Sequence, residues 1–269
     1  MINIKKWSIV ASLLLVIGVV GSVLTFKSML QTADVFEKEV MTAEKISHIQ
    51  VNVDQAEVDI VPVKNTEEIT VELTGEAAKY RKYKFEAKAE GNSVMIQLKE
   101  RQRKLFHVHF FNEGRLSLKI TVPEKEYDAM TVKVLNGRIQ ASGLNVRTGT
   151  VQTVNGRIHL SDIQSNNIKA KSENGEIHLN EVAGKLTGTV TNGHISMVTN
   201  NLERPVDLKT VNGRITIETD HEPDHVTFDV SVVNGRAEIF GRKFKDAMIG
   251  NGKHLVRLET INGNINVHK

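Results

Sequence analysis

Four side chains that could bind a metal ion lie near the middle of the sequence. Glu176 and His178 are two residues apart, and His159 and His194 occupy related positions in the preceding and following stretches. Residues two apart on a β-strand share a face, and imidazole and carboxylate groups are ligands of zinc. If these stretches stack, the four side chains could converge on one ion. Histidines in polar surface positions need no such role, and the sequence as a whole predicts no metal, no cofactor and no catalytic residue.

Basic side chains also recur at matched positions. Each follows an Asn-Gly pair, and the set is Arg138, Arg157, Arg214 and Arg236. Cations stacked about 5 Å apart repel one another, so a row of them indicates an anionic ligand such as a cell-wall polymer. The alternative is a solvated face that keeps the protein soluble.

A basic and aromatic segment, Lys99–Gly114, lies between two predicted strands. Its candidate contact residues are Arg101, Arg103, Lys104, Phe106, Phe110 and Phe111. Exposed aromatic side chains beside cations suit an anionic lipid surface or a membrane-protein partner. The alternative is one more buried strand, because Phe and Val are common in strands.

Composition and motifs exclude several classes of function. The absence of cysteine excludes disulfides, thiolate metal sites and thiol nucleophiles, and a formal net charge of +3 gives no indication of nucleic-acid binding. The sequence has no Gly-x-Ser-x-Gly, P-loop or His-Glu-x-x-His motif, and Glu176, Glu238 and Glu259 stand isolated from one another. We therefore expect a non-catalytic binding protein. A carbohydrate-active enzyme, which would need two facing carboxylates, is the competing class.

An internal repeat must position all of these residues. The stretch Thr153–Leu160 is one of seven similar copies, with Asn-Gly pairs that begin at Asn136, Asn155, Asn174, Asn192, Asn212, Asn234 and Asn262. The steps between them are 19, 19, 18, 20, 22 and 28 residues. Self-similarity at such a period indicates a repeat architecture.

Each copy predicts two short strands around a sharp corner. Apolar residues alternate with polar ones on both sides of the Asn-Gly pair, as at Ile158 and Leu160, and Gly permits positive φ at the corner. An Asn-Gly pair suits a two-residue hairpin turn, or a solenoid corner where each residue stacks on its equivalent in the next copy. The equal spacing of Leu144, Ile163 and Val182 past their glycines favours an all-β solenoid with rungs of about 20 residues.

The repeat extends toward the N-terminus in a degenerate form. If Gln55-Ala56 replaces Asn-Gly, then Val51, Val53, Val58 and Ile60 fall at buried positions of a first rung. The alternation predicts further strands at Ile69–Leu73, Tyr83–Ala87, Val94–Leu98 and Leu116–Val122.

The N-terminal residues predict a membrane anchor. Ser8–Phe26 is an uncharged run that follows Lys5 and Lys6. As a helix it would be about 29 Å long, which matches the hydrocarbon core of a bilayer. The run lacks the small-x-small site of a cleaved signal peptide, so we predict an uncleaved signal anchor with a cytoplasmic N-terminus.

The predicted organisation has three parts. Residues 1–27 form a cytoplasmic tip and transmembrane signal anchor, and residues 28–47 form a stalk that is helical or a flexible tether. Residues 48–269 form an extracytoplasmic β-solenoid, irregular over 48–128 and built of regular Asn-Gly repeats over 129–269.

The anchor, Val122-Pro123 and the row of Asn-Gly-x-Ile-x-apolar rungs resemble the bacterial "putative adhesin" domain of unknown function. The layout is similar to that of the LiaG-like membrane proteins of Gram-positive bacteria, and the resemblance covers residues 46–269. It implies a β-solenoid at the cell envelope with a link to envelope-stress signalling. Such a protein would act as a binding, adhesion or scaffold module, or as the accessory partner of a membrane sensor. The family offers no catalytic residues.

Overall fold

The computed structural model describes residues 11–22, 32–78, 82–101, 115–244 and 246–269. Residues 11–22 form a helix. The strands are β1 (Thr32–Thr42), β2 (His48–Gln55), β3 (Glu57–Val63), β4 (Glu68–Ala78), β5 (Lys82–Glu90), β6 (Ser93–Arg101), β7 (Arg115–Pro123), β8 (Glu126–Ser142), β9 (Asn145–Ile163), β10 (Asn167–Val182), β11 (Lys185–Thr199), β12 (Val206–Asn212), β13 (Ile215–Thr219), β14 (Val226–Ile239), β15 (Arg242–Phe244), β16 (Asp246–Ile249) and β17 (His254–His268). The protein is nearly all β, as the sequence predicted.

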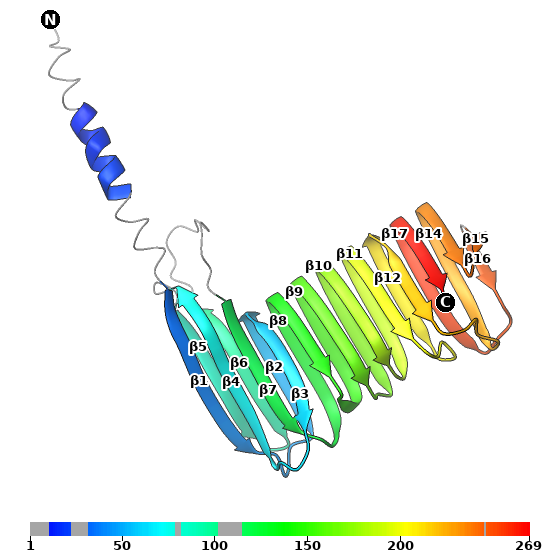
Figure 1. Ribbon diagram of the computed structural model, residues 1–269, viewed down its shortest axis with the longest axis horizontal. Helices are drawn as coiled ribbons and strands as arrows, with labels where there is room; N and C mark the ends of the chain where they lie inside the picture. The colour runs from blue at the N-terminus through cyan, green and yellow to red at the C-terminus, as the bar shows by residue number, and fades with distance from the viewer. Residues whose placement is uncertain (1–10, 23–31, 79–81, 102–114, 245) are drawn as a thin grey trace, which may run out of the picture.

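The Asn-Gly copies stack as rungs of a solenoid (Figure 1). Strands β8 to β11 pair in parallel and in register, and β13 continues the stack on β11. Equivalent isoleucines therefore form one column: Ile139, Ile158, Ile177, Ile195 and Ile215. Each copy pairs with its neighbours and not with itself across its own corner. The predicted solenoid is confirmed, and the hairpin alternative is wrong.

The core lies between the two halves of each rung, which face each other because the chain folds back at the corner. Val151 before the corner and Ile158 and Leu160 after it are fully buried. Burying an aliphatic side chain of this size stabilises the fold by about 1.5–3 kcal/mol relative to leaving it exposed. The repeated pattern thus builds one continuous core along the stack.

The degenerate first rung is also confirmed. β2 and β3 pair in parallel with the two halves of β8, and Gln55 lies opposite Asn136. The four predicted inward residues, Val51, Val53, Val58 and Ile60, are all buried.

A further rung lies outside the first. β6 pairs in parallel with β2, and β7 pairs in parallel with β3, so these two strands lie on the two halves of the first rung. The sequence predicted both strands but not this pairing. Antiparallel strands complete this end, with β5 on β6, β4 on β7 and β1 on β4.

Strand β1 corrects the predicted stalk. It pairs antiparallel with β4 along its whole length, from Thr32 opposite Ala78 to Thr42 opposite Glu68. The loose apolar spacing in this stretch, including Val35, favoured a helix in isolation. The open edge of β4 offers backbone hydrogen-bond partners to an extended chain, and the extended form also buries Val35.

The last two rungs do not stack in chain order. β17 lies between β12–β13 and β14, with Asn262 opposite Asn212 on one side and opposite Asn234 on the other. The seventh copy is thus inserted before the sixth. β15 and β16 pair antiparallel with β14 and cover its outer side, which protects the end of the sheet from pairing with other chains.

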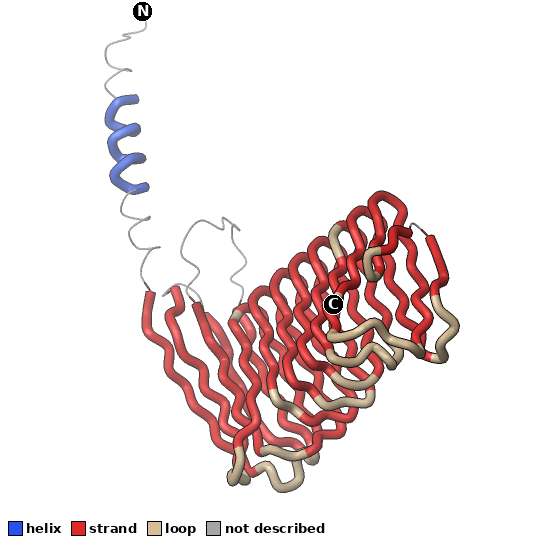
Figure 2. Tube along the Cα trace, turned by 45° about the vertical axis from the view of Figure 1, so that its right-hand side comes forward, coloured by secondary structure: helices blue, strands red, loops and turns tan. Residues whose placement is uncertain are grey.

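The solenoid has two unlike edges (Figure 2). The corner edge is the row of Asn-Gly pairs with the residue directly before and the residue directly after each pair. Loops such as residues 200–205 lie along the opposite edge. β1 begins at the corner edge, because Asp34 lies opposite Glu76, which in turn pairs with Arg115 at the start of β7.

The predicted anchor, Ser8–Phe26, lies partly outside the described residues. The helix at residues 11–22 carries exposed apolar side chains, among them Leu14 and Ile17. In the part of the chain that the structure describes, no helix has both the length and the apolar character needed to cross a membrane.

Candidate functional site: the corner edge

Seven asparagine side chains form one hydrogen-bonded ladder along the corner edge. The Nδ2 of each donates to the Oδ1 of the neighbour before it at 2.7–2.9 Å, in the spatial order Asn136, Asn155, Asn174, Asn192, Asn212, Asn262 and Asn234. All six bonds run in the same direction along the stack. Stacked amide ladders of this kind add to the stability of parallel in-register strands.

Glycine is required beside the ladder for two reasons. Gly175 has a φ of 151°, and a Cβ added there would lie 1.8 Å from the carbonyl oxygen of Gly156. The same carbonyl accepts a hydrogen bond from Ser172 Oγ at 3.4 Å, and Thr260 Oγ1 donates equivalently to Gly213 at 3.1 Å. Contacts between rungs therefore fix the corner backbone.

The predicted arginines follow the glycines in one exposed column. Arg138 Nη1 lies 4.0 Å from Glu57 Oε2, and Arg157 Nε lies 3.0 Å from Glu176 Oε2. Exposed ion pairs of this kind contribute about 0–1 kcal/mol to stability. They balance the charge of this half of the corner edge.

The other two arginines have different surroundings. The backbone N–H of Arg214 donates to His194 Nδ1 at 3.2 Å, and that of Arg236 donates to Asn264 Oδ1 at 3.1 Å. Within the described residues, no ion pair joins either guanidinium to an acidic side chain. The positive charge of the column is therefore concentrated at its C-terminal end.

The predicted metal cluster is brought together only in part. His178 lies with Nε2 3.1 Å from Glu176 Oε2 and Nδ1 2.7 Å from Ser196 Oγ, so both of its nitrogens have partners. The ring of His159 is 6.2 Å from that of His178, whereas His194 accepts a backbone hydrogen bond. Over the described ranges, no three His, Asp or Glu side chains are arranged to hold a metal ion.

Two pKa shifts arise in this cluster. The hydrogen bond from His178 is the main cause that lowers the pKa of Glu176; burial opposes it, and the charge of Arg157 also lowers the pKa. Burial lowers the pKa of His159, and the charges of His178 and Arg138 add to the effect. Both shifts favour the state in which Glu176 is ionised and His159 is neutral.

An apolar column that the sequence analysis missed flanks the ladder on its other side. It consists of aliphatic residues directly before the asparagines. Val154 is half-buried, and the exposed fractions are 46% for Leu135, 37% for Val211, 40% for Ile261 and 56% for Val233. Glu173 and Thr191 interrupt it. The sequence could have indicated this column, because aliphatic residues stand directly before the asparagines at outward-facing positions where polar residues are expected.

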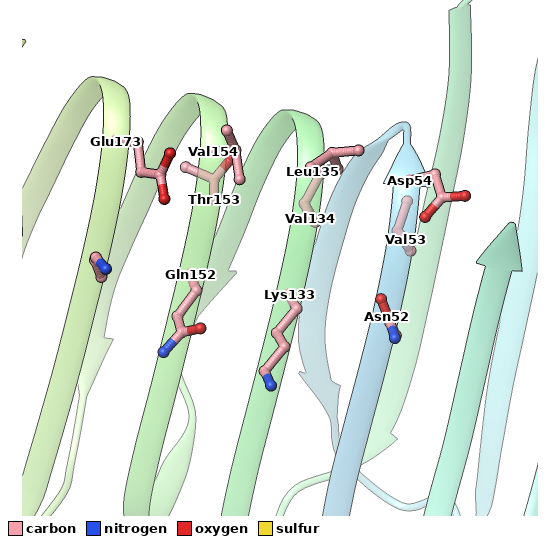
Figure 3. Close-up of a pocket in the computed structure, with 11 residues that line it drawn as sticks. Asn52, Val53, Asp54, Lys133, Val134, Leu135, Gln152, Thr153, Val154 and Glu173 are labelled. Carbon is pink, nitrogen blue, oxygen red and sulfur yellow. The ribbon is translucent and has the colours of Figure 1, made fainter. Parts of the chain in front are cut away.

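Two shallow grooves follow the corner edge. One, of about 250 Å³, crosses β2, β8, β9 and β10; Figure 3 shows Lys133, Gln152 and Glu173 on neighbouring strands along it. The other follows the glycines and is lined by Glu57, Arg138, Arg157 and Glu176 together with the corner glycines.

Each groove holds two carboxylates that are three rungs apart. These are Asp54 and Glu173 in the first groove and Glu57 and Glu176 in the second. Three strand spacings amount to roughly 14 Å. The strands that carry each pair are therefore farther apart than the paired carboxyl groups of glycosidases, which are separated by only about 5–9.5 Å.

Most of the basic and aromatic segment lies outside the described residues. This holds for Arg103, Lys104, Phe106, Phe110 and Phe111, while Arg101 is the last residue of β6. The backbone N–H of Glu100 donates to Asp54 Oδ2 at 2.9 Å, so the segment begins beside the corner of the first rung. Its role as a contact surface stays a prediction.

Comparison with known proteins gives a family for this fold. No curated protein matches the chain. Similar solved structures include a "putative cell adhesion protein" from Clostridium sporogenes (14% identical, 88% of this chain and 99% of that chain covered, TM-score 0.42) and a "putative adhesin" from Bacteroides fragilis (8% identical, 87% and 97% covered, TM-score 0.43). One family model matches twice, over residues 46–182 and 136–268, as the internal repeat allows. The chain belongs to the Toastrack DUF4097 family.

Proposed function

We propose that this protein is a single-pass membrane protein whose extracytoplasmic β-solenoid is a non-catalytic binding, adhesion or scaffold module at the cell envelope. The observation that carries the proposal is the position of Thr32. β1 starts at the corner edge, and the uncharged run Ser8–Phe26 lies a few residues ahead of it in the sequence. An anchor attached there keeps the domain at the membrane.

The charge flanking the apolar run supports the proposed orientation. Lys5 and Lys6 precede the run, and basic residues next to a membrane span favour the cytoplasmic side. Thr32 and everything after it then lie outside. Among the described residues, the buried core cluster runs from Val35 to Val267 and includes no residue of the helix at 11–22.

The corner edge supports binding more than catalysis. It displays equivalent side chains every ~4.8 Å on a rigid frame, a spacing that suits an extended anionic polymer or a protein partner. The two carboxylates in each groove come from strands three rungs apart, which does not favour the close pair that glycoside hydrolysis needs. A module of this kind, held at the membrane, could also serve a sensor of envelope stress as its accessory partner.

Cell fractionation tests the anchor. We expect the full chain to stay in the membrane fraction after an alkaline wash, and protease added outside intact protoplasts to digest the solenoid. Leu14→Lys with Ile17→Lys should release the protein, because charged side chains are costly at the centre of a bilayer. Leu14→Ile with Ile17→Leu is the matched control and should remain in the membrane. A soluble full chain, or a solenoid protected from external protease, would contradict the proposal.

A further inference from the structure

The last three rungs in space form a patch of distinct composition on the corner edge. This distal patch consists of Val211, Ile261 and Val233 on one side of the asparagine ladder and Arg214 and Arg236 on the other. The three aliphatic side chains are 37–56% exposed. A patch with both apolar and basic side chains suits a bilayer, which has an apolar interior beneath headgroups that can be anionic.

The inserted strand β17 sets the spacing of charge in the distal patch. It places Asn264 between Arg214 and Arg236, so the two arginines are two rungs, or roughly 10 Å, apart. Stacking in chain order would put them on adjacent rungs, where like charges repel more strongly. The observed order thus keeps two separate cations available.

The distal patch also lies on the edge where the chain enters the solenoid. Thr32 marks that entry at the N-terminal end of the stack, and the distal patch lies at the other end of the same edge. Between them the arginines are balanced by Glu57 and Glu176. A membrane anchored ahead of Thr32 would therefore meet the distal patch as its second contact point.

We infer that the distal patch rests on the anionic lipid headgroups of the membrane that holds the anchor, so that the solenoid lies along the bilayer with its corner edge inward. This inference rests on the proposed membrane anchoring. Each contact is weak alone, but the anchor confines the domain near the surface, and a tethered second contact forms at a high effective concentration. The arginine contribution weakens as salt screens it.

The absence of native cysteine permits a direct test on the full chain in proteoliposomes. Val233→Cys carries an environment-sensitive fluorophore in the distal patch, and Asn200→Cys carries it in an exposed loop at the opposite edge. The vesicles contain phosphatidylglycerol and lipids with nitroxide-labelled headgroups, which quench nearby fluorophores. We expect a larger loss of emission at position 233 than at position 200.

The charge dependence supplies a second readout. In the Val233→Cys background, Arg214→Gln with Arg236→Gln should reduce the quenching, and so should high salt or vesicles of phosphatidylcholine alone. Arg138→Gln with Arg157→Gln is the matched control and should change it less, because those arginines are already paired with acids.

Three outcomes would overturn the inference. Equal quenching at both positions would mean that the corner edge does not face the bilayer. Energy transfer between labelled copies, without lipid quenching, would assign the distal patch to contact with a second copy. Quenching that ignores the arginine substitutions would remove the role of anionic lipid. Failure of the anchor is recognised separately, because the protein would then not float with the vesicles at all.

Discussion

Asn174 and Asn155, nineteen residues apart in the sequence, are joined by a 2.9 Å hydrogen bond between their side-chain amides. Asn174 also accepts a hydrogen bond of 2.9 Å from Asn192, so it is both donor and acceptor within the ladder. The asparagines therefore connect successive rungs in addition to forming their corners.

Replacing Asn174 by alanine should destabilise the solenoid by about 1–2 kcal/mol, because two hydrogen bonds are lost at an exposed site where water can partly replace them. Chemical denaturation monitored by circular dichroism measures the change. Glu173→Ala, next to it on the exposed surface, is the control and should stay within about 0.5 kcal/mol of the parent. Equal stabilities for the two variants would mean that the ladder contributes nothing.

Gly175→Ala should be far more damaging than Gly91→Ala. Both glycines have positive φ, at 151° and 61°, so both substitutions carry a backbone cost. A Cβ at position 175 would also meet the Gly156 carbonyl at 1.8 Å, whereas a Cβ at position 91 has nothing within 4 Å. We expect Gly175→Ala to cost more than about 4 kcal/mol and Gly91→Ala about 1 kcal/mol. Similar melting temperatures for the two would refute the close packing of rungs at the corner.

Thr153 and Thr260 occupy equivalent positions but differ in hydrogen bonding. Thr260 Oγ1 donates to Gly213 at 3.1 Å, whereas the Thr153 hydroxyl is buried with no partner. Thr153→Val should therefore be neutral or stabilising, and Val134 and Val190 already fill this column elsewhere. Thr260→Val should cost about 1 kcal/mol. Chemical denaturation measures the free energy of unfolding of both variants, and Thr153→Val should be the more stable one. A more stable Thr260→Val variant would contradict the hydrogen bonding described.

The repeat made the middle of the fold predictable and left its two ends open. In-register stacking of Asn-Gly copies follows from the sequence, because a slip would move the inward isoleucines to the outer face. The insertion of β17 does not follow, since all copies share one register and any two can pair. The 28-residue step before Asn262 was the one hint that something intervenes.

The corner edge was predicted less completely than the core. The arginine column follows directly from the repeat, but the asparagines were interpreted only as corner residues, and their ladder became apparent from the stacked geometry. β1 was missed for a different reason. Its apolar spacing is weak, and pairing with β4, a contact distant in sequence, decides its conformation.

Substitution should destabilise the domain far more at Ile177 than at Arg157, because these residues lie on an inward and an outward column of neighbouring rungs. Ile177 is fully buried, so Ile177→Asp places a charge in the core without a partner and should unfold the domain. Arg157→Ser removes an exposed ion pair with Glu176 and should cost less than about 1 kcal/mol. Thermal unfolding compares them; a folded Ile177→Asp variant would show that the column does not face the core.

His159→Gln should make the solenoid less sensitive to mild acid. Burial lowers the pKa of His159 in the folded protein below the ordinary histidine value of 6.5. As the pH falls through 6.5, the unfolded chain therefore binds a proton at His159 before the folded protein does. The stability that depends on neutral His159 is therefore present above pH 6.5 and is lost as the pH falls toward the lowered folded pKa. Glutamine, which Gln140 provides at the same position one rung earlier, has no such titration. Chemical denaturation at pH 7 and at pH 5 measures the effect. Glu176 stays ionised at both values, because its pKa is lowered from 4.5. The parent should lose more stability than His159→Gln between these values, and equal losses would rule out His159 as the group responsible.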